Sequence, residues 1–289
     1  MTDQGERYDR MAHGYGTWWG PVLEPAALRV LDLVAADLAA GGPDAAGQRL
    51  VDVGTGTGTL AIAAAERWRE LRVLGVDASD GMLGYARLAA DQRLGSRAPV
   101  ARANLVFRQG LVDRLPDLAE GADVVVSSFV YQLVPSRSRA LREAWRVLRP
   151  GGRLAWVTWL DHEGARFGAD EVFDEALEAV GLEARGGAED DGRAGDLPSV
   201  RAAADQVRRA GFRTVTAFAE ALVHDFTPES YLGFLAGFDE EDLFTELDAD
   251  LRGRLEVELL TRLRARPAAD LRMELPVVYA SGVKPPTRS

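Results

Sequence analysis

The chain of 289 residues contains no cysteine, a single lysine and three histidines. The absence of cysteine excludes disulfide bonds, thiolate catalysis and cysteine-ligated metal sites. No cluster of side chains has the spacing of metal ligands, so we expect no bound metal. The first ten residues are polar, and no apolar run approaches the roughly 18 residues of a membrane span. We therefore expect a cytoplasmic protein without a membrane partner.

Positive charge is also scarce, because the formal net charge is -11 at pH 7. An acidic surface repels a phosphate backbone, and no basic run offsets it, so nucleic acid is excluded as a partner. Hydrophobic residues make up 47% of the chain, which is ample for a buried core. The composition is ordinary for a soluble globular enzyme, and a homo-oligomer remains possible.

Short apolar strands alternate with helical patterns in the first 160 residues. Strands are predicted at 48–54, 72–79, 103–110, 122–129 and 153–160, with helices at 25–40, 59–71, 80–95 and 138–152. Later segments predict helices at 167–183, 199–212 and within 228–266, and strands at 213–223 and 271–283. This order indicates an α/β fold, a doubly wound and mostly parallel seven-stranded sheet, with its ligand crevice at the carboxyl ends of the strands.

We expect one domain with a cap. The last two strands are expected to form an antiparallel edge, with the helices between them lying over the crevice. The predicted parts are a helical lid (1–46), a cofactor-binding core (48–160), the remainder of the core (161–225 and 269–284) and a helical cap (226–268).

The glycine-rich stretch VDVGTGTG at 51–58 can be interpreted in two ways. Gly54, Gly56 and Gly58 form a G-x-G-x-G turn preceded by Asp52. Gly56, Gly58 and Ala61 instead match the looser G-x-G-x-x-A of a dinucleotide site. The negative charge of Asp52 suits the cationic end of a ligand better than a pyrophosphate, but the motif alone does not decide.

Four longer segments resemble the class I S-adenosylmethionine-dependent methyltransferases of bacterial small-molecule metabolism. They are LVDVGTGTG, VLGVDASDGMLGYAR, GADVVVSSFVYQLV and REAWRVLRPGGRLAWVTW, in that order. The resemblance implies S-adenosyl-L-methionine as cofactor and methyl transfer to a small molecule. Oxygen is the first choice of acceptor atom, and natural-product metabolism is the expected context.

The resemblance also implies the cofactor residues. Asp52 would lie near the methionine amine, Asp77 near the ribose hydroxyls, and Ser127 and Phe129 beside the sulfonium. The glycines would let the turn approach the ligand. The full set expected to bind the cofactor is Asp52, Gly54, Thr55, Gly56, Gly58, Asp77, Ala78, Met82, Leu111, Val112, Ser127 and Phe129.

One position departs from the family. Leu111 in QGLVDRLP stands where the family carries an aspartate that contacts the adenine amino group. The backbone of Leu111 and Val112 could make this contact, Asp113 could reach it, or the cofactor could bind weakly. Two other functions therefore stay open: a methyltransferase-fold protein that binds or catalyses without methylating, and an NAD-dependent oxidoreductase.

Substrate and catalytic residues are harder to assign. Tyr15, Trp18 and Trp19 are expected to form a lid that contacts substrate, although aromatic side chains near a terminus can simply dock on the core. Tyr131 and Gln132 follow the fourth strand and either orient substrate or pack normally. A hydroxyl acceptor benefits from a general base. The candidates are His162 and His13, each of which can also be an ordinary surface histidine.

Overall fold

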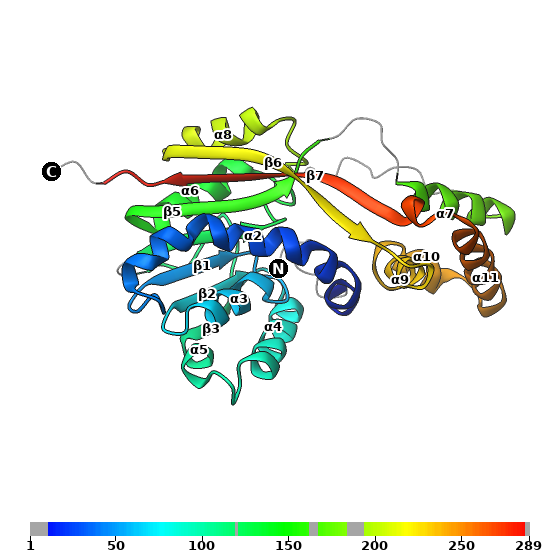
Figure 1. Ribbon diagram of the computed structural model, residues 1–289, viewed down its shortest axis with the longest axis horizontal. Coiled ribbons are helices and arrows are strands. Elements are labelled where there is room, and N and C mark those ends of the chain that lie inside the picture. The colour runs from blue at the N-terminus through cyan, green and yellow to red at the C-terminus, as the bar shows by residue number, and fades with distance from the viewer. Residues whose placement is uncertain (1–10, 119–120, 162–166, 184–193, 287–289) are drawn as a thin grey trace.

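The computed structural model describes residues 11–118, 121–161, 167–183 and 194–286, and a seven-stranded sheet forms its centre (Figure 1). The strand order is β3-β2-β1-β4-β5-β7-β6. β7 runs antiparallel to both of its neighbours, and the other pairs are parallel. The predicted fold class and antiparallel edge are thus confirmed. The strands are β1 (Arg49–Val53), β2 (Arg72–Asp77), β3 (Leu105–Gln109), β4 (Ala122–Ser128), β5 (Leu148–Trp159), β6 (Arg213–Asp225) and β7 (Arg272–Val283).

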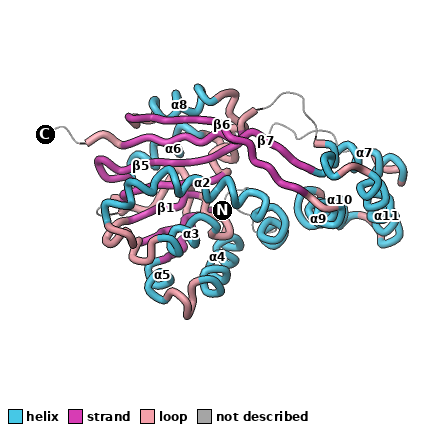
Figure 2. Tube along the Cα trace, viewed as in Figure 1, coloured by secondary structure: helices cyan, strands magenta, loops and turns pink. Residues whose placement is uncertain are grey.

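Helices cover both faces of the sheet (Figure 2). Alternate residues of the buried strands point to opposite faces, so Leu50 and Val51 of β1 belong to two separate apolar clusters. One face is covered by α2 (Gly20–Leu38), α3 (Thr59–Arg67), α4 (Asp80–Arg93) and α5 (Pro99–Asn104). The other is covered by α6 (Arg137–Val147) and α8 (Val200–Arg209).

A helical cap sits at the far end of a hairpin formed by β6 and β7 (Figure 1). β5 pairs with only residues 277–283 of β7, whereas β6 pairs with β7 along the whole strand. The hairpin therefore extends beyond the sheet. It carries α9 (Pro228–Phe234), the π-helix η3 (Leu235–Asp239), α10 (Glu241–Glu246), α11 (Ala249–Ala265) and the 3-10 turn η4 (Ala268–Leu271).

α7 (Gly168–Ala179) joins this cap, although the sequence pattern assigns residues 161–225 to the core. It packs along α11, and the ring of its Phe173 stacks on Phe244 of α10 at 6.3 Å between centroids. The chain thus leaves the core after β5, contributes one helix to the cap and returns for α8. The cap therefore contains more of the chain than the predicted 226–268.

Several predicted boundaries differ from the structure, and two of the differences have a clear physical reason. The helix predicted at 138–152 ends at Val147, and β5 starts at Leu148, because Pro150 disfavours a helical conformation at the residue before it. The strand predicted at 103–110 begins only at Leu105, because the short helix α5 precedes it. Among the described helices, none has the length and apolar character needed to cross a membrane.

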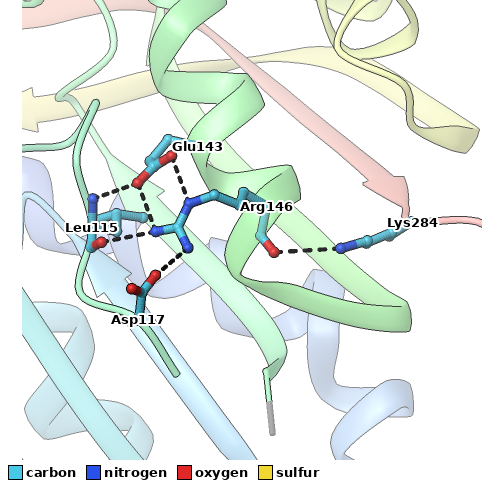
Figure 3. A network of polar contacts seen from close by, with 5 residues as sticks. All are labelled: Leu115, Asp117, Glu143, Arg146 and Lys284. Atoms are coloured by element: carbon cyan, nitrogen blue, oxygen red, sulfur yellow. Dashed lines mark hydrogen bonds and ion pairs between the residues drawn. The ribbon is translucent and has the colours of Figure 1, made fainter. Parts of the chain in front are cut away.

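A polar network fastens the β3–β4 connection and the chain after β7 to α6 (Figure 3). The Arg146 guanidinium donates to Glu143, to Asp117 and to the carbonyl of Leu115, while Glu143 accepts from the Leu115 N–H at 2.7 Å. Lys284 donates to the carbonyls of Arg146 and Leu148 at the end of α6. These bonds hold in place a connection that has no described helix of its own.

The Glu143→Gln variant tests the charge in this network. Hydrogen bonds from Arg146 hold the pKa of Glu143 below its usual 4.5. Its carboxylate therefore stabilises the fold above that pH, and the effect is lost as the pH falls further. We expect the variant to lose about 1 kcal/mol of unfolding free energy at pH 7, with the difference closing toward pH 3. Urea unfolding at both pH values measures this, and an equal difference at both would contradict it.

Candidate functional site

The glycine-rich turn connects β1 to α3 and needs backbone conformations that other residues rarely adopt. Gly54, Gly56 and Gly58 have φ angles of +68°, +53° and +88°. A Cβ on Gly54 would meet the Val130 side chain at 2.3 Å, so the turn packs closely there. A Cβ on Gly56 would have nothing within 4 Å. The middle of the turn thus presents bare backbone to open space, as a site for a close-fitting ligand requires.

Asp52 lies beneath this turn and is only 1% exposed. Its Oδ2 accepts hydrogen bonds from Thr55 Oγ1 at 2.7 Å and from the Ala61 N–H at 3.2 Å. No described residue supplies a partner for the buried Oδ1. Burial is the main cause that raises the pKa of Asp52 to about 7, and the two hydrogen bonds oppose it. A buried acceptor without a partner fits a site that is completed by a donor on a ligand.

Asp77 ends β2 on the other side of the turn. Its Oδ2 accepts from the Gly56 N–H at 2.8 Å and its Oδ1 from the Ser79 N–H at 2.9 Å. These bonds fix the carboxylate at the carboxyl end of the sheet. Ser79 caps α4 by accepting from the Met82 N–H at 3.0 Å, as its sequence position predicts.

A narrow pocket lies over the turn and includes the start of α3. Gly58, just before this helix, has no side chain to bond its first N–H groups, and Asp52 bonds only that of Ala61, so the remaining N–H groups and the dipole favour a negative charge. The free space that remains is only about 20 Å³, room for about one water. Segments from the lid, α2, the turn and β4 close around it. The lining residues are Tyr15, Gly20, Leu23, Glu24, Ala27, Gly54, Thr55, Gly56, Thr57, Thr59, Ser128 and Phe129.

The expected adenine side lies between the ends of β2 and β3. Gln109 donates to the Ala78 carbonyl at 2.9 Å, and Leu111 begins a tight turn in which its carbonyl accepts from the Arg114 N–H. Asp113 forms an ion pair with Arg139 at 3.2 Å. This pairing directs Asp113 toward α6. A contact from the backbone of the half-buried Leu111 and Val112, or weak binding of the cofactor, therefore stays open for this position.

At the end of β4 the pocket residue is Ser128 rather than the expected Ser127. The Ser127 hydroxyl is buried and donates to the Val53 carbonyl at 2.8 Å, which ties β4 to β1. Phe129 lines the pocket with φ +54°. A phenylalanine in this region of φ is strained and persists only where its surroundings fix it, which is common at functional sites. Strand alternation could have identified Ser128, but the strained Phe129 backbone has no signal in the sequence.

Tyr131 and Gln132 lie in the core and are not brought to the pocket. Gln132 accepts from Thr158 Oγ1 at 2.6 Å. The Tyr131 ring contacts Trp156 edge-on at 5.2 Å, in the cluster on the α6 face. Burial raises the pKa of Tyr131, and no described residue bonds its hydroxyl. The positions of Tyr131 and Gln132 favour ordinary packing over a role in orienting substrate.

The three lid aromatics belong to the π-helix η1 (Tyr15–Trp19), which lies between the core and the cap. Tyr15 lines the pocket and contacts Phe238 of the cap at 5.8 Å. Trp18 lies against Gly233 and Gly237, where a Cβ on either glycine would be within 2.5 Å of its ring. Trp19 meets Trp159 of β5 and Phe234 of α9 at 6.1 and 5.2 Å. Trp18 is thus placed to anchor the lid to the cap, and Tyr15 and Trp19 face the crevice.

None of the histidines that the structure describes lines the pocket, so none of them is placed there as a general base. His162 lies outside the described residues. His13 is exposed, with its ring 6.1 Å from Tyr85 of α4. His224, at the end of β6, packs edge-on against Phe226, and burial lowers its pKa. Within the described part of the chain, no three carboxylate or imidazole groups are arranged to hold a metal ion.

Comparison with known proteins decides between the two interpretations of the glycine turn. Residues 51–156 match the family described as "Methyltransferase domain". The chain is 33% identical over 193 residues to the malonyl-[acyl-carrier protein] O-methyltransferase of Geobacter sulfurreducens, covering 66% of this chain and 65% of that one. Residues 51–156 are thus a methyltransferase domain of the class I S-adenosylmethionine-dependent type. The comparison therefore favours the G-x-G-x-G interpretation with S-adenosyl-L-methionine as the cofactor, and it does not support the NAD-dependent interpretation.

More distant similarities agree with this family. The 27-O-demethylrifamycin SV methyltransferase of Amycolatopsis mediterranei is 34% identical over 149 residues, covering 51% of this chain and 50% of that one. Among the first curated relatives, the chain spans between 27% and 65% of their length. Two solved structures share the fold of this methyltransferase. They are the YcgJ protein from Bacillus subtilis (TM-score 0.54, 18% identity, 89% of this chain and 98% of that one) and the [4+2]-cyclase SpnF (0.53, 20%, 89% and 80%).

The protonation of Asp52 can be measured through stability. Because its pKa is raised to about 7, the folded protein keeps this proton at pH values at which the unfolded chain has released it. The stability contributed by the group is therefore greatest below about pH 4 and falls as the pH rises to about 7. Asp52→Asn should flatten the dependence of unfolding free energy on pH in that window. Parallel curves for variant and parent would mean that the buried carboxylate is already ionised.

The packing of Trp18 against Gly233 and Gly237 gives a second prediction. In an exposed helix, Gly→Ala raises stability by up to about 1 kcal/mol, as we expect for Gly253→Ala, where a Cβ would have nothing within 4 Å. Gly233→Ala should instead lower the unfolding temperature and speed proteolysis in residues 11–19, because its Cβ would lie 2.3 Å from the Trp18 ring. Equal stability of the two variants, with a protected lid, would overturn the anchoring role of Trp18.

Proposed function

We propose that this protein transfers the methyl group of S-adenosyl-L-methionine to a small-molecule acceptor, with an oxygen atom as the first choice. The single observation that carries the proposal is the pair of carboxylates at the glycine turn. Asp52 offers an unpartnered buried oxygen, and Asp77 is fixed by the Gly56 N–H. Their positions suit a ligand with an ammonium at one end and ribose hydroxyls at the other.

The rest of the pocket supports the same ligand. The open start of α3 suits the methionine carboxylate, and the bare backbone at Gly56 allows close approach. Met82, Ala78 and the turn at Leu111 and Val112 would surround the adenine. We therefore carry the expected cofactor residues forward, with Ser128 replacing Ser127 at the pocket wall.

When bound, the cofactor supplies an activated methyl group on a positively charged sulfur. The bond from sulfur to the methyl carbon breaks as the bond from the acceptor oxygen to that carbon forms, and the hydroxyl proton must leave. The chain holds the acceptor in line and excludes water, which can supply several kcal/mol of the barrier. His162 and His13 remain the proposed proton acceptors. The natural-product context rests on the likeness to the rifamycin methyltransferase alone.

One other function has an observation in its favour. Leu111 replaces the aspartate expected at the adenine, and the fold occurs in a protein described as a [4+2]-cyclase. A protein that holds the cofactor without using its methyl group would retain the pocket and the cap. Mass analysis of reaction products distinguishes the two functions. Only methyl transfer replaces a hydrogen of the acceptor by a methyl group, which raises the mass of the acceptor by about 14 mass units.

The first test is calorimetric titration with S-adenosylmethionine and S-adenosylhomocysteine, with NAD as the negative control. The variant Gly56→Asn fills the open space at the turn, and asparagine tolerates a φ of +53° better than most residues. We expect it to bind either sulfur ligand at least tenfold more weakly than the parent.

Gly47→Asn is the matched control. Gly47 has φ +75° with nothing within 4 Å of a Cβ and lies in an exposed turn away from the pocket. The Gly47→Asn variant should fold as the Gly56→Asn variant does, and it should bind both sulfur ligands as tightly as the parent. If the parent binds neither sulfur ligand, or if both variants bind equally well, the proposed cofactor site is wrong.

A further inference from the structure

A second cavity lies on the sheet, away from the glycine turn. Its volume is about 290 Å³, near the lower end of the roughly 300–1,000 Å³ of small-molecule sites. The first residues of β1 and β2 line it, together with β3 and the end of α5. The lining residues are Arg49, Leu50, Val51, Arg72, Val73, Leu74, Ala103, Asn104, Val106, Arg108 and Leu118. None of them lines the pocket over the turn, so the cavity is a separate site.

The cavity exists because no described helix covers this face of β1, β2 and β3. The face is the one on which α6 and α8 lie, but α6 packs on β5 and α8 packs on β6 and β7. The connection from β3 to β4 is held to α6 by Arg146 and contributes Leu118 to the wall. Val51, Leu74 and Val106 are matched across the three strands and form the apolar floor. Val106, on the outermost strand, is 44% exposed.

Three arginines line the cavity, and the strand register places them on its apolar face. Arg49 and Arg72 are direct partners on the parallel strands β1 and β2, each two residues before a residue of the floor. Arg108 lies two residues after Val106 on β3. Side chains two residues apart in a strand share a face. All three arginine side chains therefore stand beside the same apolar floor.

The charge of this lining is opposite to that of the whole chain. The chain has 34 lysines and arginines against 45 aspartates and glutamates, yet the residues found to line the cavity include three arginines and no carboxylate. Like charges at directly opposed strand positions repel, as at Arg49 and Arg72. Over the described ranges of the chain, no ion pair is found for the guanidinium of Arg72 or of Arg108. An anion in the cavity would supply the missing negative charge.

We propose that this cavity binds an amphipathic anion, a small molecule with an apolar body and one carboxylate, sulfonate or phosphate group. The body lies on the apolar floor, and Arg72 and Arg108 hold the anionic group through the several donors of a planar guanidinium. The site lies at the amino ends of β1 and β2, whereas the proposed cofactor pocket lies at their carboxyl ends. This inference goes beyond the proposed function and does not rest on it.

The test is calorimetric titration of the whole protein with 2-naphthalenesulfonate as the probe. Naphthalene-2-sulfonamide has the same rings without a charge, and methanesulfonate has the charge without the rings. Because the site uses both its floor and its arginines, we expect the probe to bind at least tenfold more tightly than either comparison compound. Saturating S-adenosylhomocysteine should leave the affinity for the probe unchanged, since the two sites share no lining residue.

Charge variants locate the anionic group of the probe. Arg72→Gln and Arg108→Gln each remove one charge and should each weaken binding of the probe at least fivefold, with little effect on the sulfonamide. Arg254→Gln is the matched control, because Arg254 is an exposed arginine of α11 in the cap. It should bind the probe as tightly as the parent does. Thermal unfolding verifies that each variant is folded.

A second pair of variants tests the floor. Val106→Thr keeps the shape of a β-branched side chain but makes the floor polar, so it should weaken binding of the probe about threefold. Val223→Thr is the matched control, because Val223 is an exposed valine on the other edge strand of the sheet, β6. It should leave binding of the probe unchanged.

Four results would overturn the inference. They are no binding of the probe to the parent, equal affinity for the probe and the sulfonamide, displacement of the probe by S-adenosylhomocysteine, and arginine variants that bind like Arg254→Gln. Sedimentation adds one further check. A parent that is a dimer, with Arg72→Gln and Arg108→Gln variants that are monomers, would mean that a second copy of the chain covers this face instead of a small anion.

Discussion

The hydrogen bonds of two carboxylates to one turn determine how this site is built. Asp52 receives the N–H of Ala61 and thereby sets where α3 begins, and Asp77 receives the N–H of Gly56 and thereby sets the course of the turn. A turn with three glycines at positive φ loses much conformational entropy on folding. Each such hydrogen bond offsets about 1 kcal/mol of this cost. These bonds join the ends of β1 and β2 to the turn and to the start of α3.

The same geometry explains why the turn faces the crevice. In a parallel sheet all carboxyl ends lie on one edge, so the ends of β1, β2 and β4 bring Asp52, Asp77 and Phe129 to one place. The cap reaches this edge by a different route. It is carried by the part of the β6–β7 hairpin that extends beyond β5, so its contacts with the core depend strongly on aromatic side chains of the lid.

The sequence predicted those features that depend on local pattern. The order of strands and helices, the antiparallel edge and the placement of Asp52 and Asp77 beside the turn all follow from periodicity and turn residues. Long-range packing was less accessible. Ser127 and Ser128 are adjacent in the sequence, and the structure shows that it is Ser127 whose hydroxyl bonds to β1. The attachment of α7 to the cap depends on Phe173 meeting Phe244, a contact between segments about 70 residues apart.

Trp18 illustrates the same limit. Its sequence position predicts a lid, but the ring packs against two glycines more than 200 residues later in the chain. Only the close approach of the indole ring in the structure identifies these glycines. Gly233 and Gly237 look like helix-weakening residues in the sequence. In the structure, the Trp18 ring fits against them only because neither glycine has a side chain. A pattern within one segment cannot reveal a requirement imposed by another segment.

The closed pocket links the two halves of the site. Pockets for ligands of cofactor size are about 300–1,000 Å³, and only about 20 Å³ is free over the turn. A ligand of that size must therefore displace the residues that close the pocket, among which Tyr15 comes from η1. Trp19 belongs to the same short π-helix, and Trp18 ties that helix to the cap. Displacing Tyr15 thus also disturbs Trp18 and Trp19, so entry of a ligand over the turn and the contacts between the lid and the cap are physically coupled.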